Sequence, residues 1–233
     1  MIHSQYTWIL DIGNSNNNSR RYIDVTLLAD TLGKELCEAL PGLHAFTGCD
    51  YCPSFKGKGK VRPLNIVENF PRFRKAFGEV GSSTMTEDTY HVLEEFVCVL
   101  YGQNKVKDVN AARFSIFNEK YQSKDTNNPL KNIKGMEPSM LPPCQATLKQ
   151  HILRANFIAN MRKSSDESDI NQLDPHGNGW TKEKGKYILT WFTGPMVPDC
   201  LSDQIEEVPD KESDTESEAE ESDDSDEEEQ FFI

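Results

Sequence analysis

The sequence predicts a mixed α/β fold in which helices dominate. The clearest signal is an amphipathic stripe over Glu87–Tyr101, where apolar residues recur at the helical spacing i, i+3, i+4, i+7 and i+8. Short β-prone runs at residues 6–11, 21–23 and 187–191 supply the strand signal. Because the helical segments are longer than these runs, we expect helices to form most of the core.

The first 46 residues are expected to form two short strands and then helices. Asp24 follows the second strand and is placed to cap a helix that ends at Gly33. A second helix is expected over Lys34–Leu40. Pro41 is expected in the first turn of a separate short helix, because proline fits that position and interrupts a helix elsewhere.

The next region is predicted to be a loop followed by two short helices. Gly48–Lys60 reads GCDYCPSFKGKGK, a composition typical of a loop. A helix is expected over Val61–Asn69, with Pro63 tolerated in its first turn. A further helix is expected over Pro71–Phe77, and Gly78 is expected to stop it.

Two more strong helices follow the stripe that begins at Glu87. A capping-box pattern, Thr84-x-x-Glu87, precedes the stripe. Asp108 is placed to cap the next helix, which is expected to run to about Tyr121. Residues 123–142 read as a long loop, and Pro143 is expected to open the third helix.

Charge separates a foldable body from a tail. Residues 199–233 hold 17 of the 38 acidic residues but one of the 25 basic ones, so the other 198 residues carry 21 acids against 24 bases. Few apolar side chains and dense like charge cannot offset chain entropy, which predicts disorder in the tail. We expect three regions: 1–80, 81–197 with a C-terminal β-hairpin around a Lys-Gly turn, and the acidic tail 198–233.

The cysteines and the N-terminus predict residence in the nucleus or the cytosol. Six cysteines at irregular spacings do not form a disulfide framework in a chain of 233 residues, so reduced thiols are expected. The N-terminus lacks a signal-peptide pattern, and no apolar stretch approaches the roughly 20 residues of a membrane span. The sequence thus predicts no membrane partner.

The basic loop carries the strongest chemical signal. Residues 56–75 hold seven Lys or Arg against one Glu. Glycines let the backbone approach a phosphate closely, and lysines near a helix start add positive charge. This footprint favours contacts to the phosphates of duplex or branched DNA. The residues predicted to bind nucleic acid are Lys56, Gly57, Lys58, Gly59, Lys60, Arg62, Arg72 and Arg74. A solvated basic loop is the alternative interpretation.

The run GCDYCPSFKGKGKVRPLNIVENF resembles a stretch of flap-endonuclease-type nucleases. In that superfamily a Gly-x-Asp-Tyr turn leads into a Gly-x-Gly-Lys helical hairpin, the aspartate helps to hold a divalent metal, and the hairpin grips duplex backbone. The resemblance implies that Asp50 is a vestigial ligand for Mg²⁺ or Mn²⁺. It also implies that Gly57, Gly59 and Lys60 form the hairpin turn.

A longer resemblance covers roughly residues 20 to 200. The runs RYIDVTLLADTLGKELCEALPGLHAFTGCD, FVCVLYG, VNAARFSIF, LPPC, HILRANF and HGNGW are similar to a family of uncharacterised animal proteins. Those proteins look like mobile-element products with a PIN-like nuclease region, and many carry a Cys-rich tesmin/TSO1-like tail. The resemblance implies that this chain contains the C-terminal portion of a PIN-like domain.

The chain departs from that family in two ways. It begins late, so that most of the acidic metal cluster is missing, and no Cys-rich tail follows Trp191. Metal-assisted phosphodiester cleavage needs several carboxylates around hard cations, which Asp50 alone does not supply. Asp11 and Asp24 are read as a strand-end residue and a helix cap. We therefore expect no autonomous nuclease activity and no confident cofactor.

Other signals are weaker. Cys49-x-x-Cys52 is half of a zinc pattern without a second half, so two reduced thiols are the favoured interpretation. The histidines, and the aromatic residues 70, 73 and 77, are expected to serve packing. An acidic residue stands three places after each of four tail hydroxyls, a pattern that acid-directed kinases favour. These phosphorylation candidates are Ser213, Thr215, Ser217 and Ser225.

The leading hypothesis is a catalytically incomplete, nuclease-like DNA-binding module derived from a mobile element. The first alternative is a protein-interaction module, in which the helices 87–101 and 144–162 present a binding face and the tail attracts basic proteins. The second is a fragment of a gene that does not function alone. The third is an active metal-dependent nuclease whose remaining carboxylates the sequence does not identify.

Overall fold

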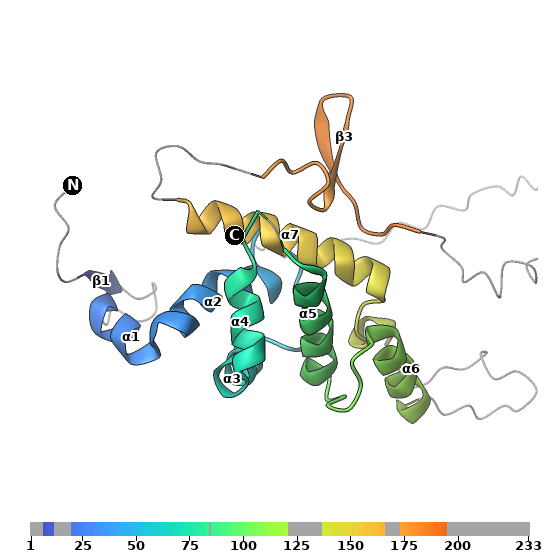
Figure 1. Cartoon of the computed structure of the whole chain (residues 1–233), viewed down its shortest axis with the longest axis horizontal. Coiled ribbons are helices and arrows are strands. Elements are labelled where there is room, and N and C mark those ends of the chain that lie inside the picture. Colours follow the sequence, from blue (N-terminus) through green and yellow to red (C-terminus); the bar gives the residue numbers. More distant parts are fainter. Residues whose placement is uncertain (1–6, 12–19, 84, 121–136, 166–172, 195–233) are drawn as a thin grey trace, which may run out of the picture. The chain divides into compact units, whose positions relative to one another are not determined.

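The computed structural model describes residues 7–11, 20–83, 85–120, 137–165 and 173–194. Helices dominate it, as the sequence predicts (Figure 1). Its strands form two separate two-stranded hairpins, of which the sequence analysis predicted the C-terminal one as a hairpin and the N-terminal one as two short strands. The elements are β1 (Trp8–Asp11), β2 (Arg21–Asp24), α1 (Val25–Leu32), α2 (Lys34–Phe46), α3 (Val61–Asn69), α4 (Pro71–Glu79), α5 (Glu87–Leu100), α6 (Val109–Lys120), the 3-10 turn η1 (Pro138–Met140), α7 (Gln145–Lys163), β3 (Trp180–Glu183) and β4 (Lys186–Leu189).

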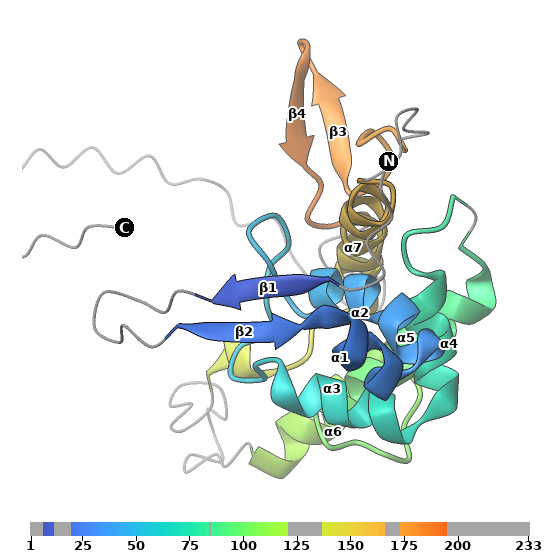
Figure 2. The same cartoon turned by 90° about the vertical axis from the view of Figure 1, so that its left-hand side faces the viewer.

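The N-terminal hairpin leads directly into α1. β1 and β2 pair antiparallel, with Ile9 opposite Ile23 (Figure 2). Asp24 caps α1, because its side chain accepts a hydrogen bond of 2.9 Å from the Leu27 N–H. Gly33 ends the helix with φ of 76°, a conformation that glycine adopts at little cost. The predictions for this segment are confirmed.

α2 is one continuous helix, and the prediction that Pro41 opens a separate helix is wrong. Pro41 lies inside α2, where it lacks the N–H that would reach the carbonyl of Cys37. Packing of α2 against both α4 and α7 outweighs that loss. The tightest approach is at Gly42, where an added Cβ would lie 2.5 Å from the Phe77 carbonyl oxygen and 2.8 Å from the Val80 Cβ.

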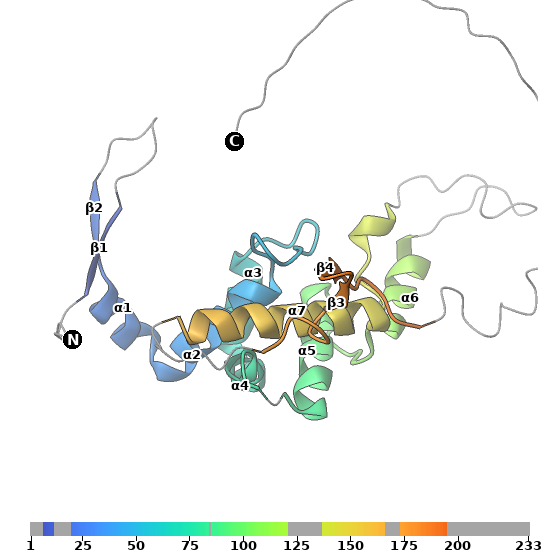
Figure 3. The same ribbon diagram turned by 90° about the horizontal axis from the view of Figure 1, so that it is seen from above.

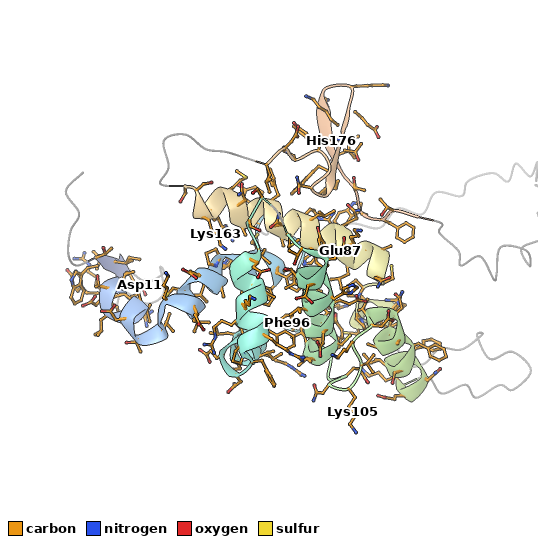
Figure 4. The ribbon with its side chains drawn as sticks, viewed as in Figure 1. Asp11, Glu87, Phe96, Lys105, Lys163 and His176 are labelled. Carbon is orange, nitrogen blue, oxygen red and sulfur yellow. The ribbon has the colours of Figure 1, made fainter. Side chains whose placement is uncertain are left out.

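Four phenylalanines from three helices form the centre of the core. The rings of Phe46 and Phe96 lie 5.9 Å apart, and Phe77 contacts both at 5.4 and 4.8 Å in edge-on geometries. Phe73 packs on Phe96 at 5.5 Å, and Figure 4 shows Phe96 between α4 and α5. α7 lies across α2 and α5 and closes this core (Figures 1 and 3). The regions expected on either side of residue 80 therefore share one core.

Several helix ends differ from the predictions. Thr86 caps α5, since its hydroxyl accepts a 3.2 Å bond from the Thr89 N–H, whereas Thr84 lies outside the described residues. α4 continues through Gly78 to Glu79. α7 begins at Gln145, two residues after Pro143, with Cys144 at its N-cap. In contrast, Asp108 accepts a 2.6 Å bond from the Ala111 N–H, so the predicted cap of α6 is confirmed.

The C-terminal hairpin forms as predicted. Lys184 and Gly185 both have positive φ, 48° and 80°, the geometry that favours a tight two-residue turn between β3 and β4. The rings of Phe157 on α7 and Trp180 lie 5.1 Å apart. At Gly179 an added Cβ would lie 2.3 Å from the Arg154 side chain, so only glycine fits at this contact. The hairpin is thus anchored to α7.

One compact unit spans Met1–Gly194. None of the helices among the described residues has the length and apolar composition that crossing a membrane requires. The predicted acidic tail and its phosphorylation candidates Ser213, Thr215, Ser217 and Ser225 lie outside the described residues.

Candidate nucleic-acid interface

The Gly/Lys loop forms two tight turns between α2 and α3. In the first, Cys49 and Cys52 pair backbone to backbone, with N–H···O distances of 2.9 and 3.1 Å. In the second, Gly57 and Gly59 adopt φ of 70° and 57°, and α3 begins two residues later. The expected Gly-x-Gly-Lys turn at the start of a helix is therefore present.

Lys60 is held by the C-terminal end of α2. Its Nζ donates to the His44 carbonyl and to the Thr47 hydroxyl, both at 2.9 Å, and to the Gly48 carbonyl. The last carbonyls of a helix lack partners within the helix, so this lysine caps α2 and ties the loop to it. Partial burial lowers the pKa of Lys60 from its usual value.

Three more of the predicted cations are engaged with acceptors of the chain itself. Lys56 pairs with Glu137 and donates to the Ser139 hydroxyl at 3.0 Å. Arg72 on α4 forms an ion pair with Glu95 at 2.7 Å. Arg74 donates to the Glu68 carbonyl at 2.6 Å and lies 3.3 Å from Glu35. These three side chains are bound to groups of the chain itself, whereas the alternative interpretation expected a solvated basic loop.

The charges of Arg62 and Lys120 both act on Lys58, and we call these three cations the Lys58 cluster. Arg62 also donates a hydrogen bond of 3.4 Å to the Val99 carbonyl. Burial lowers the pKa of Lys58, and so do the neighbouring charges of Arg62 and Lys120. The Lys58 Nζ stands 4.1 Å from the ring centre of Tyr101, a cation–π contact. Among the described residues, no carboxylate forms an ion pair with any of the three cations. Lys120 is distant from Lys58 in sequence, so no local pattern predicts that it belongs to this cluster.

The three carboxylates considered as metal ligands, those of Asp11, Asp24 and Asp50, do not form a common site. Asp50 is exposed in the two-residue turn between Cys49 and Cys52. Asp11 ends β1, at the end of the hairpin remote from α1, and accepts bonds of 3.1 and 2.6 Å from Arg21. Asp24 lies at the other end of the hairpin and caps α1. Within the described ranges, no three His, Cys, Asp or Glu side chains come together as metal ligands. The described residues therefore offer no set of ligands around Asp50.

The thiols and the histidines serve the fold. All five described cysteines are unpaired, as expected, and burial raises the pKa of the Cys52 thiol to about 12. His44 lies 2.7 Å from the Arg162 guanidinium. His151 is buried and donates its Nε2–H to the Phe46 carbonyl at 2.7 Å, with its pKa lowered by burial to about 4. The imidazole of His151 is thus neutral at pH 7.

The apolar stripes proposed for protein binding are occupied. Leu93, Phe96 and Val97 on α5 are fully buried inside the chain, and so is most of the corresponding face of α7. An exposed apolar surface exists instead on β1, β2 and α1, which we call the hairpin surface. Its residues are Trp8, Ile9, Leu10, Tyr22, Ile23, Leu27 and Leu28, each exposed by 38% or more.

No family model matches this chain, and no curated protein or solved structure matches it either. Its function must be argued from its own residues. The structure also contains a cavity, lined in part by Arg113, Cys144 and Arg154, that no local sequence pattern predicts.

Proposed function

We propose that this chain binds the phosphate backbone of nucleic acid through the Lys58 cluster and does not cleave it. The observation that carries the proposal is the accumulation of positive charge around Lys58 without an acidic partner among the described residues. Like charges in proximity destabilise one another, and a phosphate placed between them would remove that cost.

The turn geometry supports the same proposal. Gly57 and Gly59 carry no Cβ, and nothing lies within 4 Å of the position that a Cβ at Gly59 would take. A phosphate could therefore approach the backbone at Gly59, whereas the Met140 side chain lies 3.8 Å from the Cβ position at Gly57. Lys56, Lys60, Arg72 and Arg74 would hold the scaffold of this turn and of the adjoining helices. Descent from a PIN-like nuclease of a mobile element is part of the proposal and rests on the sequence resemblance alone.

Phosphate contacts of this kind position a partner without reading its sequence. The proposal therefore assigns a preference for backbone geometry, as in duplex or branched DNA, and not for base sequence. It assigns no cleavage, because metal-assisted hydrolysis needs several convergent carboxylates and Asp50 has none beside it among the described residues.

The test is a salt titration of binding by the full chain to linear and branched duplexes. Three phosphate contacts predict a slope of about −3 in the logarithm of the binding constant against the logarithm of salt concentration. Lys58→Ala with Arg62→Ala should weaken binding to all sequences alike and reduce the slope by about 2. A matched control, Lys182→Ala with Lys186→Ala, removes the same charge from the C-terminal hairpin and should leave binding unchanged. A binding constant that does not change with salt concentration would contradict the proposal.

A second candidate function is protein binding by the hairpin surface. Two-stranded hairpins are marginal alone, and this one exposes Trp8 by 57% and Tyr22 by 71%. Apolar patches of this kind mark interaction sites. Trp8→Ser with Tyr22→Ser should abolish capture of a protein partner and leave nucleic-acid binding intact. If the pair of substitutions changes neither, this candidate fails.

A further inference from the structure

A cavity lies between α6, α7, η1 and the loop around Phe55. Its volume is about 480 Å³, which falls in the range of small-molecule sites. The described residues that line it include three cations and no carboxylate. Its walls combine aromatic and proline side chains with Arg113, Arg154 and Lys56, the last of which is paired with Glu137.

Arg154 is the unusual member of this lining. It is fully buried on α7, where a charge is costly unless it is paired. Its Nη1 donates to the carbonyls of Thr190 at 2.6 Å and Gly179 at 3.4 Å, and the guanidinium lies 5.0 Å from the ring centre of Trp191. Its Nε is buried without a hydrogen-bond partner. Within the described ranges, no carboxylate pairs with it.

The opposite end of the cavity is also electropositive. Cys144 lies at the N-cap of α7, a helix of 19 residues, and its sulfur is 3.2 Å from the Thr147 hydroxyl. Burial raises the pKa of this thiol, but the Thr147 hydroxyl and N–H, Arg113 and the Ala146 N–H together lower it below its usual value. Arg113 donates one N–H to the Pro142 carbonyl, and no described carboxylate forms an ion pair with it.

One face of α7 connects the two ends. Thr147, His151 and Arg154 stand at i, i+4 and i+7, so this wall is about 10 Å long at 1.5 Å per residue. His151 contributes no charge at neutral pH, because its pKa is about 4. Phe55 and Tyr101 add apolar surface opposite charged groups. Charge at the ends and apolar walls between them suit an organic anion of similar length.

We propose that this cavity binds a small organic acid, with its anionic group on the Arg154 guanidinium and its apolar part along Phe55 and Tyr101 toward Cys144. The buried Nε without a partner and the lack of an acidic lining residue are the observations that point to an anion. The proposal does not rest on nucleic-acid binding by the Lys58 cluster: Lys58, Arg62 and Lys120 do not line the cavity, although Lys58 stands over the ring of Tyr101, which does.

Alkylation of Cys144 in the full chain tests the proposal. The thiolate sulfur displaces iodide from iodoacetate or iodoacetamide, and mass spectrometry follows each cysteine separately. The positive charge of Arg113 at the Cys144 end of the cavity should favour the anionic reagent over the neutral one at Cys144 by about tenfold relative to the same ratio at Cys37. Phenyl phosphate should slow the reaction at Cys144 in a saturable way and leave Cys37 unaffected. Equal ratios at the two cysteines, or no protection by phenyl phosphate, would overturn the proposal.

Substitutions of Arg154 and Arg113 separate the effect of their positive charge on anion binding from their effect on folding. Arg154→Gln should abolish the protection, whereas Arg154→Lys should retain part of it. If both unfold, Arg113→Gln serves instead, since it should lower the preference for iodoacetate while the chain stays folded. Single-stranded DNA is the last probe. Protection by DNA but not by phenyl phosphate would place the cavity in a nucleic-acid site and overturn a small acid as its ligand.

Discussion

The Nζ of Lys60 donates a hydrogen bond of 2.9 Å to the hydroxyl of Thr47, the C-cap residue of α2. Lys58, two residues earlier, has no hydrogen bond of this kind among the described contacts and stands over Tyr101. Two lysines of the same Gly/Lys turn thus make different contacts. One completes a helix end, and the other is available to a ligand.

This difference predicts that alanine substitution of Lys60 lowers the stability of the chain much more than alanine substitution of Lys58. Lys60→Ala should lower the free energy of unfolding by about 1 to 3 kcal/mol, because it leaves acceptors at the end of α2 without a charged donor. Lys58→Ala should change stability by less than about 0.5 kcal/mol, since surface positions away from such bonds tolerate change. Urea denaturation of both variants measures this. Equal destabilisation would show that Lys60 is not the cap of α2.

Two glycines provide a matched pair for the packing of α2 on α4. Gly42→Ala places a Cβ 2.5 Å from the Phe77 carbonyl oxygen, so the helices must separate, and we expect a loss of about 3 kcal/mol. Gly78→Ala meets no atom within 4 Å inside α4, and better helix propensity should stabilise the chain by about 0.5 kcal/mol. Thermal denaturation compares them. A harmless Gly42→Ala would contradict the close contact.

Burial of neutral His151 predicts a loss of stability in mild acid. Its pKa is lowered to about 4 in the folded chain, against an unfolded value near 6.5, so the unfolded chain binds more protons between these values. The free energy of unfolding therefore falls as the pH is lowered from 6.5 toward 4. His151 accounts for at most about 3 kcal/mol of this loss. His151→Gln should be less stable at pH 7 but should flatten the profile over this window. An unchanged slope would rule out His151 as its source.

Local signals in the sequence predicted most elements, while tertiary contacts decided the exceptions. Asp24 and Asp108 cap helices as predicted, because a cap depends on residues two or three places away. Pro41 does not break α2, because α4 and α7 pack against that helix. No local pattern reports such packing.

The candidate site was predictable only in part, for the same reason. The Gly57–Lys60 turn is a local feature, and the sequence identified it. Which of the predicted cations can still bind a ligand depends on partners that are distant in sequence. Glu137 pairs with Lys56, and Glu95 pairs with Arg72. The approach of Lys120 to Lys58 is likewise a tertiary relationship.

The acidic tail provides the last prediction, and it tests the electrostatic basis of the nucleic-acid proposal. Residues 199–233 carry a net charge of −16, from 17 acids and Lys211, and we expect this charge to compete with phosphates for the Lys58 cluster. A chain that ends at Gly194, the last residue of the compact unit, should bind duplex DNA about tenfold more tightly at low salt, and the gain should vanish at high salt. Fluorescence anisotropy measures both. If the shortened chain gains no DNA affinity but loses a basic protein partner, the tail acts in protein binding, and the nucleic-acid proposal loses its electrostatic basis.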